Sequence, residues 1–386
     1  MRTKLFLIIF LVLGIFLTNN LIGRGVGTSS ATFLKIPTTS RIIGLSEAVT
    51  AIIDDPSAIS VNPAGLGNID KLHILISHYD WISDIGYEYL AMAYPSFKGI
   101  KGEQGVLGLG IAYLHIPSFF NYGEWGEIIE NDKLTYNDFA ISIGYGQKIK
   151  NFVIGNTFKV IHEMVDDISG TTFTIDLGAI YDIKLPAARI AGFNTKGKIL
   201  KLGLAILNIG LMDIKGYSTP LTIKLGIGSK LAKDFLMNFD FEKPLDNRIR
   251  INWGIEYTLI EIISIRAGYR FIGYETDSFT FGLGVGYRFG ERLAKIGTAY
   301  APQGPFKSTL NFTAEMKFPG SKPEDIIKLA EMYYYQGIYY YTKGDYDKAI
   351  QMWKEVLKLI PDHKKALEKI KDAEYLKKLK EIEDLK

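Results

Sequence analysis

Hydrophobic and polar positions alternate with a period of two through most of the chain. In DSFTFGLGVGYRFG, residues 277–290, large apolar side chains fill every second position from Phe279 to Phe289, with small or polar residues such as Thr280 and Arg288 between them. Successive side chains of a β-strand point to opposite faces, so this segment would have one apolar face and one small or polar face. The pattern predicts a strand.

About fourteen segments carry this alternation, and most have the 9–11 or so residues of a tilted strand that crosses a membrane. They are 72–79, 85–95, 104–115, 136–147, 152–163, 171–184, 198–208, 220–231, 235–243, 248–258, 262–270, 277–288, 293–300 and 308–318. The chain is therefore expected to be largely β between residues 71 and 318.

The polar faces of these segments carry charge in strand after strand, whereas the opposite faces are large and apolar. The charged positions are Lys224, Lys230, Asp240, Glu242, Arg250, Glu256, Arg266, Arg270 and Arg288. A soluble β-sandwich also alternates, but an apolar outer band around a polar interior is typical of a membrane barrel. In lipid, a closed barrel is the sheet that satisfies its backbone groups. We expect an all-β transmembrane barrel of about fourteen antiparallel strands, with these charges paired in its lumen.

The connections agree with a barrel whose two ends lie in the periplasm. The longest, roughly 116–135, would then lie outside the cell, and short ones near 148–151, 232–234 and 259–261 would lie in the periplasm. The long periplasmic connection 185–197 is an exception. The outer loop is rich in aromatic residues that suit a substrate landing site or a protein-docking patch: Phe119, Phe120, Tyr122 and Trp125.

The N-terminus predicts export. MRTK precedes about thirteen apolar residues, as in a secretory signal peptide, which we place at about 1–27. A membrane anchor, the alternative, needs about 20 apolar residues, and Thr18-Asn19-Asn20 interrupt this run. The chain has no cysteine, which excludes disulfides and thiol chemistry, and a net charge of only +3. Nucleic-acid binding is not expected without a concentrated basic face.

A different pattern precedes the strands. Apolar residues between Ile42 and Ile53 have a loosely helical spacing over about three turns, and Pro56 should end that helix. A second short turn can begin at Ser57, and Asn62-Pro63 with Gly65 favours a tight turn. This is a compact element that does not pair with the strands.

The same stretch carries a resemblance. It resembles the N-terminal block of the PorV/PorQ family, outer-membrane barrels related to FadL-type fatty acid transporters, at Ser40, Arg41, Gly44, Asp54, Asp55, Asn62, Pro63, Ala64 and Gly65. The resemblance implies that residues 28–70 form a hatch inside a fourteen-stranded barrel. Asp54 and Asp55 would either cap a helix or meet basic lumen residues. Inward-facing glycines would leave room for the hatch or for a ligand.

From residue 321 to 386 the period becomes helical and the composition highly charged. The spacing fits one 34-residue tetratricopeptide repeat at Tyr333, Gly337, Tyr340, Ala349, Trp353 and Pro361. One repeat cannot bury its own face. The module should therefore dock on the barrel's periplasmic rim, a second copy or a partner, or else only stabilise the barrel.

The sequence predicts no enzyme, cofactor or metal site. The histidines lack ligand spacing, and the phosphate-loop-like GLGVG at 282–286 lies in a strand pattern with no helix after it. We expect a bacterial outer-membrane protein, in contact with lipid, whose N-terminal end and C-terminal module lie in the periplasm. The module and outer loops would make it an anchor or partner for envelope or secreted proteins. The alternative is a FadL-like channel for hydrophobic small molecules.

Overall fold

The computed structural model describes residues 25, 27–98, 103–122, 125, 127–185, 189–190, 193–194, 199–214, 216–232, 234–260, 262–272, 278–290, 292–304, 308–319, 323–360 and 363–383. Residues 1–24 of the expected signal peptide lie outside this set. The chain divides after Pro319 into two compact units, which are described separately. None of the helices within the described ranges is long and apolar enough to cross a membrane.

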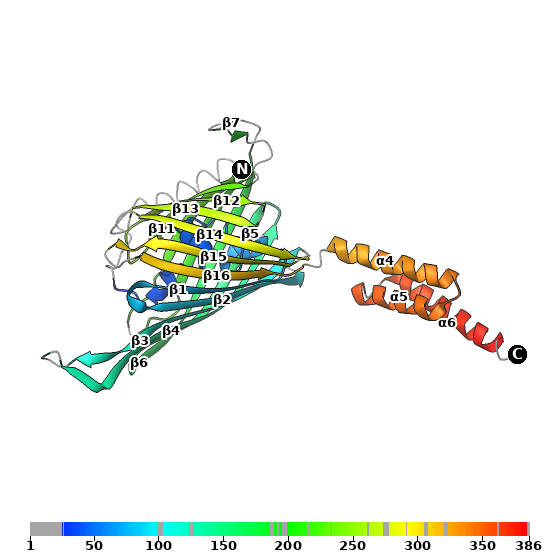
Figure 1. Ribbon diagram of the computed structural model, residues 1–386, viewed down its shortest axis with the longest axis horizontal. Coiled ribbons are helices and arrows are strands. Elements are labelled where there is room, and N and C mark those ends of the chain that lie inside the picture. The colour runs from blue at the N-terminus through cyan, green and yellow to red at the C-terminus, as the bar shows by residue number, and fades with distance from the viewer. Residues whose placement is uncertain are drawn as a thin grey trace. The chain divides into compact units, whose positions relative to one another are not determined.

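Fourteen strands of the described chain form a closed antiparallel barrel (Figure 1). They are β1 (His73–Asp80), β2 (Gly86–Lys98), β3 (Gln104–Tyr122), β4 (Ile128–Ile149), β5 (Phe152–Val165), β6 (Ile168–Lys184), β9 (Ile199–Gly210), β10 (Thr222–Lys230), β11 (Phe235–Pro244), β12 (Arg250–Leu259), β13 (Ile263–Ile272), β14 (Ser278–Phe289), β15 (Arg292–Pro302) and β16 (Ser308–Lys317). Pairing of β1 with β16 closes the ring. The predicted fold class is confirmed, and each predicted segment corresponds to one strand.

The period of two separates the inside of the barrel from the outside. Phe279, Phe281 and Leu283 of β14 are each more than half exposed, whereas Thr280, between the first two, is fully buried. The outward row is apolar on strand after strand, which is the surface of a barrel that spans a membrane.

Two connections differ from the prediction. The expected outer loop 116–135 is mostly a hairpin extension, since Phe119 pairs with Leu134 and Tyr122 with Ile128 (Figure 1). Residues here are rich in β-branched and aromatic types, which favour a pleated ladder. Trp125, one of the two residues described in the turn, is 91% exposed. The connection 185–197 contains a two-stranded ribbon, β7 (Arg189–Ile190) with β8 (Phe193–Asn194).

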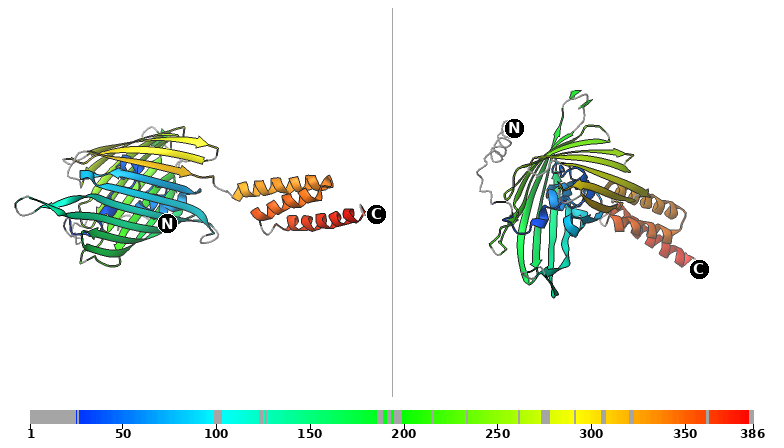
Figure 2. Two further views of the ribbon diagram at one scale, coloured as in Figure 1. Left: turned by 60° about the horizontal axis from the view of Figure 1, so that its bottom comes forward. Right: turned by 60° about the vertical axis from the view of Figure 1, so that its left-hand side comes forward.

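The segment before β1 lies within the ring of strands (Figure 2) and forms short elements. They are η1 (Thr32–Lys35), α2 (Ser40–Gly44), α3 (Ala58–Val61) and η2 (Pro63–Asn68); η3 (Ile82–Asp84) connects β1 to β2. The predicted three-turn helix is wrong, because α2 ends after a single turn. Ser46 and Glu47 then adopt left-handed φ angles of 51° and 67°, conformations that interrupt a right-handed helix.

The second unit contains three helices, α4 (Pro323–Thr342), α5 (Tyr346–Leu359) and α6 (Lys364–Glu383). Gly344 turns the chain with φ 74°, and the Asp345 side chain accepts from the Lys348 amide to cap α5. Trp353 is fully buried and donates from Nε1 to the Tyr334 carbonyl at 3.1 Å. A Cβ at Gly337 would lie 2.3 Å from that nitrogen, so glycine permits the close approach of α4 and α5.

Candidate functional site: the hatch and the base cavity

The segment Ser30–Asp70, here called the hatch, runs through the lumen from one end to the other. The base is the end where β1 begins at His73 and β16 ends at Lys317. At the opposite, far end, the Ser30 amide donates to the Ser218 carbonyl between β9 and β10 at 3.0 Å. The Ala31 amide donates to Glu163 at 2.6 Å. The described start of the hatch thus lies at the far end, away from the base where we expected the N-terminal end to lie.

The barrel wall is the inner face of the fourteen strands, and several of its glycines lie against the backbone of the hatch. A Cβ at Gly203 would be 2.6 Å from the Thr50 carbonyl oxygen, and one at Gly155 would be 2.3 Å from that of Pro63. Gly108, Gly144, Gly146, Gly226, Gly228, Gly254, Gly268 and Gly282 also have hatch atoms within 3.2 Å of such a Cβ. These inward glycines therefore make room for the hatch. Gly284 is an exception, since it faces Arg266 instead.

Arg41 is the main ionic link in the hatch. Its guanidinium pairs with Asp54, with Asp55 at 3.1 Å and with Glu256 of β12 at 3.1 Å. Glu256 also accepts from Arg266 of β13 at 2.7 Å. We call Arg41, Asp54, Asp55, Glu256 and Arg266 the latch. It ties two hatch segments to each other and to the wall.

The two aspartates of the hatch have different surroundings. Asp55 is buried, caps the turn by accepting from the Ser57 amide at 2.9 Å, and also pairs with Arg41. The Asp54 side chain is half exposed within the lumen. Although burial opposes its ionisation, Arg41 and, at longer range, Lys317 and Lys230 hold the pKa of Asp54 below its usual range. Asp55 thus closes a turn and pairs with Arg41, whereas Asp54 pairs with Arg41 alone.

Further wall charges hold the middle of the hatch. Asp240 of β11 accepts from the amides of Val49 and Thr50 at 3.0 and 2.8 Å, the donors that a longer helix would have used internally. Arg270 of β13 pairs with Glu47 at 3.3 Å. Removing one partner of a buried pair typically costs about 3–5 kcal/mol. The hatch is thus bound to the wall by directional contacts as well as by packing.

The remaining predicted lumen charges are distributed along the wall. Glu242 pairs with Lys224 at 2.9 Å and with Arg250 at 3.3 Å, which forms one buried network. Lys230 lines a cavity at the base. Arg288, near the base end of β14, lies opposite Leu293 of β15 in the register.

The sequence interpretation missed several lumen contacts. Lys35 of η1 pairs with Asp246 at 2.6 Å, and Lys159 pairs with Asp176 in a fully buried contact at 2.7 Å. Strand parity could have found Lys159 and Asp176, because both lie on the inward face of the neighbouring strands β5 and β6, where Lys159 is opposite Thr174 and thus diagonal to Asp176. Lys35 and Asp246 lie outside the strands, so no periodicity indicates them.

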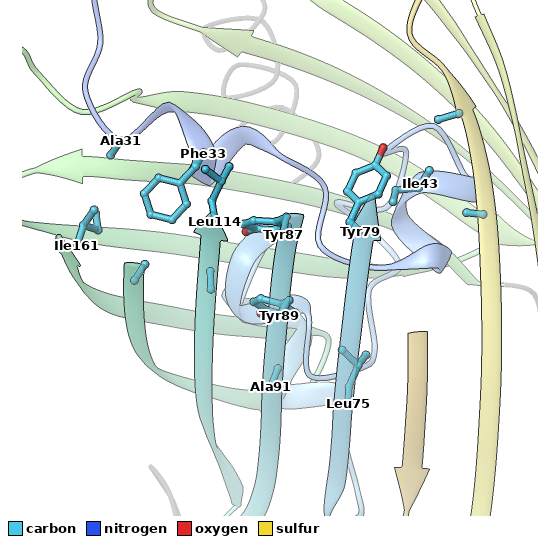
Figure 3. Packing of buried hydrophobic residues seen from close by; sticks show 14 residues of the cluster. Ala31, Phe33, Ile43, Leu75, Tyr79, Tyr87, Tyr89, Ala91, Leu114 and Ile161 are labelled. Carbon is cyan, nitrogen blue, oxygen red and sulfur yellow. The ribbon is translucent and has the colours of Figure 1, made fainter. Parts of the chain in front are cut away.

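Aromatic and aliphatic side chains fill the lumen around the first part of the hatch. Phe33 of η1 is buried among wall residues that include Tyr87, Leu114 and Ile161 (Figure 3). The chain's own side chains thus occupy this part of the lumen.

Between the hatch and the base lies a cavity of about 800 Å³, here called the base cavity. Its walls are charged and hydroxyl-rich. The charged lining residues are Arg41, Asp54, Asp55, Lys201, Lys230, Asp234, Glu256, Arg266, Lys295, Glu315 and Lys317. This chemistry suits polar molecules better than hydrocarbons.

The helical module presents an exposed apolar stripe. Met332, Tyr335 and Tyr339 are 46%, 67% and 55% exposed and lie on one face of α4 at spacings of three and four. The repeat positions Tyr333 and Tyr340 instead pack with the buried Trp353 cluster. Pro361 lies outside the described residues. The stripe is available for a partner surface.

Comparisons with known proteins were made for the sequence and for the structure. Residues 330–363 match the tetratricopeptide repeat family. No curated protein has a sequence that matches this chain. The PorV/PorQ resemblance remains a prediction.

Among solved structures, the toluene transporter TodX of Pseudomonas putida aligns at TM-score 0.48 and 11% identity, covering 71% of this chain and 97% of its own. A FadL homologue of Pseudomonas aeruginosa aligns at 0.46 and 10%, covering 73% and 98%. CdiB of Acinetobacter baumannii aligns at 0.36 and 8%, covering 64% and 60%. None of these scores reaches 0.5, and the closed ring of fourteen strands in the chain itself defines the fold.

Proposed function

We propose that this protein is an outer-membrane barrel that anchors or holds a protein partner through its helical module and its long β3–β4 hairpin. The observation that carries the proposal is the closed lumen. Hatch backbone lies directly against wall glycines, such as Thr50 against Gly203, and Phe33 is buried in a separate apolar cluster with wall residues. A barrel plugged at this density serves better as an anchor than as an open pore.

The module supports the same role. A single repeat leaves an apolar face that neighbouring repeats would otherwise cover, and here that face includes Tyr335 and Tyr339. Tyrosine supplies large contact area at low entropic cost and is enriched at protein interfaces. We place the module in the periplasm, where it would meet envelope proteins or proteins in transit.

Site-specific photocrosslinking in living cells tests the partner role. A photoreactive phenylalanine analogue replaces Tyr335 on the stripe or, as a matched control, Tyr375 on α6, which is 63% exposed. We expect Tyr335 to yield one crosslinked protein that Tyr375 does not. Native mass spectrometry should show that protein at fixed stoichiometry, lost when residues 321–386 are deleted. Absence of a specific crosslink from Met332, Tyr335 and Tyr339 would reject the proposal.

A channel for small molecules is the second candidate, favoured by the base cavity beneath the hatch. It requires the hatch to move, because the wall glycines lie against it. A small molecule retained by the full-length protein in native mass spectrometry, with no protein bound, would favour this candidate over the anchor.

A further inference from the structure

The charges that line the base cavity are unequally paired. Arg41 and Arg266 are engaged with the carboxylates of the latch. Lys201 pairs with Asp182 at 2.7 Å, and Glu315 is bonded to His73 at 2.7 Å. Most of the charged side chains that line the cavity therefore have a polar partner within the chain itself.

Three lysines remain. Within the described residues, Lys230, Lys295 and Lys317 form no ion pair, although Lys295 lies opposite Glu315 in the β15–β16 register, and Asp234 is the one lining carboxylate without a side-chain partner there. The lysines come from β10, β15 and β16, and all three line the same cavity. An excess of unpaired ammonium groups in a partly enclosed space concentrates positive potential there.

The lysines act on one element of the hatch. Lys317 and Lys230 both contribute to holding the pKa of Asp54 low, so their charges reach this carboxylate although neither bonds it. Asp54 is half exposed to the cavity. Hydroxyl groups of Thr258 and Ser264 line the same space, whereas the Thr313 hydroxyl already donates to Asn311 at 2.9 Å. The cavity therefore offers both ammonium and hydroxyl donors to an incoming anion.

We infer that the base cavity is a binding site for a small molecule that carries two or more carboxylate or phosphate groups, with Lys230, Lys295 and Lys317 as its charge-recognising residues. A volume of about 800 Å³ admits a molecule of this class with part of its hydration. The anionic groups of the ligand would compete with the Asp54 carboxylate for electrostatic attraction to Lys230 and Lys317. This inference is independent of the proposed partner role, which concerns the helical module.

The test measures binding of citrate, a tricarboxylate, to the full-length protein in detergent by titration calorimetry. Lys230→Gln, Lys295→Gln and Lys317→Gln are compared with Lys150→Gln, which removes the same charge at the exposed β4–β5 turn of the base. We expect each cavity substitution to weaken binding about tenfold, the effect of a lost hydrogen bond to a charged group. Lys150→Gln should leave the affinity unchanged.

Two further measurements, on the wild-type protein and on Asp54→Asn, test the inference even if a lysine variant folds poorly. Wild-type affinity should fall as sodium chloride rises from about 0.05 to 0.5 M, because mobile ions screen the lysines. Asp54→Asn should bind citrate more tightly, since the competing carboxylate is lost. The inference would be overturned if uncharged trimethyl citrate bound with the same affinity as citrate. It would also be overturned if the affinity for citrate changed neither with salt nor on substitution of the three lysines.

Discussion

Among single residues, the glycines of the wall decide how closely the hatch can lie. At Gly203 an added Cβ would meet backbone atoms of Thr50 and Ala51 within 2.7 Å, and backbone cannot rotate aside. We predict that Gly203→Ala lowers the free energy of unfolding by about 1–3 kcal/mol, the usual cost of overpacking. Urea unfolding of the barrel in lipid vesicles measures this change.

Gly284→Ala is the matched control for that experiment. Its added Cβ would lie 3.2 Å from the flexible end of Arg266, which can shift toward the cavity. The control should therefore change the free energy of unfolding by much less. Equal effects of the two substitutions would show that the hatch does not pack against the wall as described.

Asp54 gives the latch a defined pH dependence. Its pKa is lowered in the folded protein, so its stabilising contribution is complete above the ordinary aspartate pKa of about 3.9 and declines below it. We predict that passive permeability of reconstituted barrels stays constant from about pH 8 to 5 and increases below about pH 4.

The Asp54→Asn variant separates this effect from general acid unfolding. It should be more permeable than wild type at neutral pH and should gain less on acidification. A permeability increase near pH 6 in wild type, or an unchanged neutral value in the variant, would contradict the role of Asp54 in the latch.

The sequence could predict which strand residues face the lumen but not which partner each would choose. The parity of Glu256 and Arg266 indicated the inner face, and the register places them directly opposite one another. Arg41 pairs with Glu256 across more than two hundred positions, and only the three-dimensional path of the hatch brings them together. Arg41 lies in a hatch segment without a regular period, so its sequence position does not indicate which wall residue it faces.

At the scale of elements, strands were predictable and the hatch was not. A strand buries one row of side chains, so its period appears directly in the sequence. Hatch residues from Ile42 to Ile53 are buried on every side by the surrounding wall. Burial of that kind produces an apolar pattern without requiring a helix, and Asp240 supplies the hydrogen bonds that a helix would have made.

Deleting residues 32–60 tests the hatch as an element. Because these residues fill the lumen between the wall glycines, we predict a large increase in passive uptake of small solutes by reconstituted barrels. The control deletes residues 119–132 from the β3–β4 extension, outside the closed ring that β1 and β16 complete. Unchanged uptake in the hatch deletion would contradict a lumen plug.

The helical hairpin depends on one small residue. Gly337→Ala gains about 1 kcal/mol of helix propensity, but the new methyl group would contact the buried indole of Trp353, whose nitrogen is already bonded to Tyr334. We predict that overpacking, at about 1–3 kcal/mol, outweighs the gain. Hydrogen exchange of the full-length protein should then show weaker amide protection in α4 and α5.

Gln336→Ala provides the comparison for Gly337→Ala. Gln336 is exposed on the same helix, so its substitution changes propensity without adding volume to the core. It should leave amide protection equal or slightly raised. Stronger protection in Gly337→Ala than in Gln336→Ala would show that α4 and α5 are not in close contact at this position.

For the whole molecule, the division after Pro319 implies two units of unequal independence. The barrel closes on itself and carries its own plug, whereas the module is a single repeat with an additional helix and an uncovered stripe. We predict that residues 1–319 alone insert into outer membranes and retain the urea unfolding midpoint of the full-length barrel. Residues 321–386 alone should be only partly helical by circular dichroism, because fewer than about three repeats rarely hold a core.

Adding the crosslinked partner to the isolated module then gives a measurement that distinguishes anchor from pore. If the module evolved to be covered, its helicity should rise on binding, and Tyr335→Ala should reduce that rise while Tyr375→Ala should not. If the isolated module is fully helical and its helicity does not change when the partner is added, Met332, Tyr335 and Tyr339 have no role in binding. The closed lumen would then have to open, and the base cavity beneath the hatch would become the main functional site of the chain.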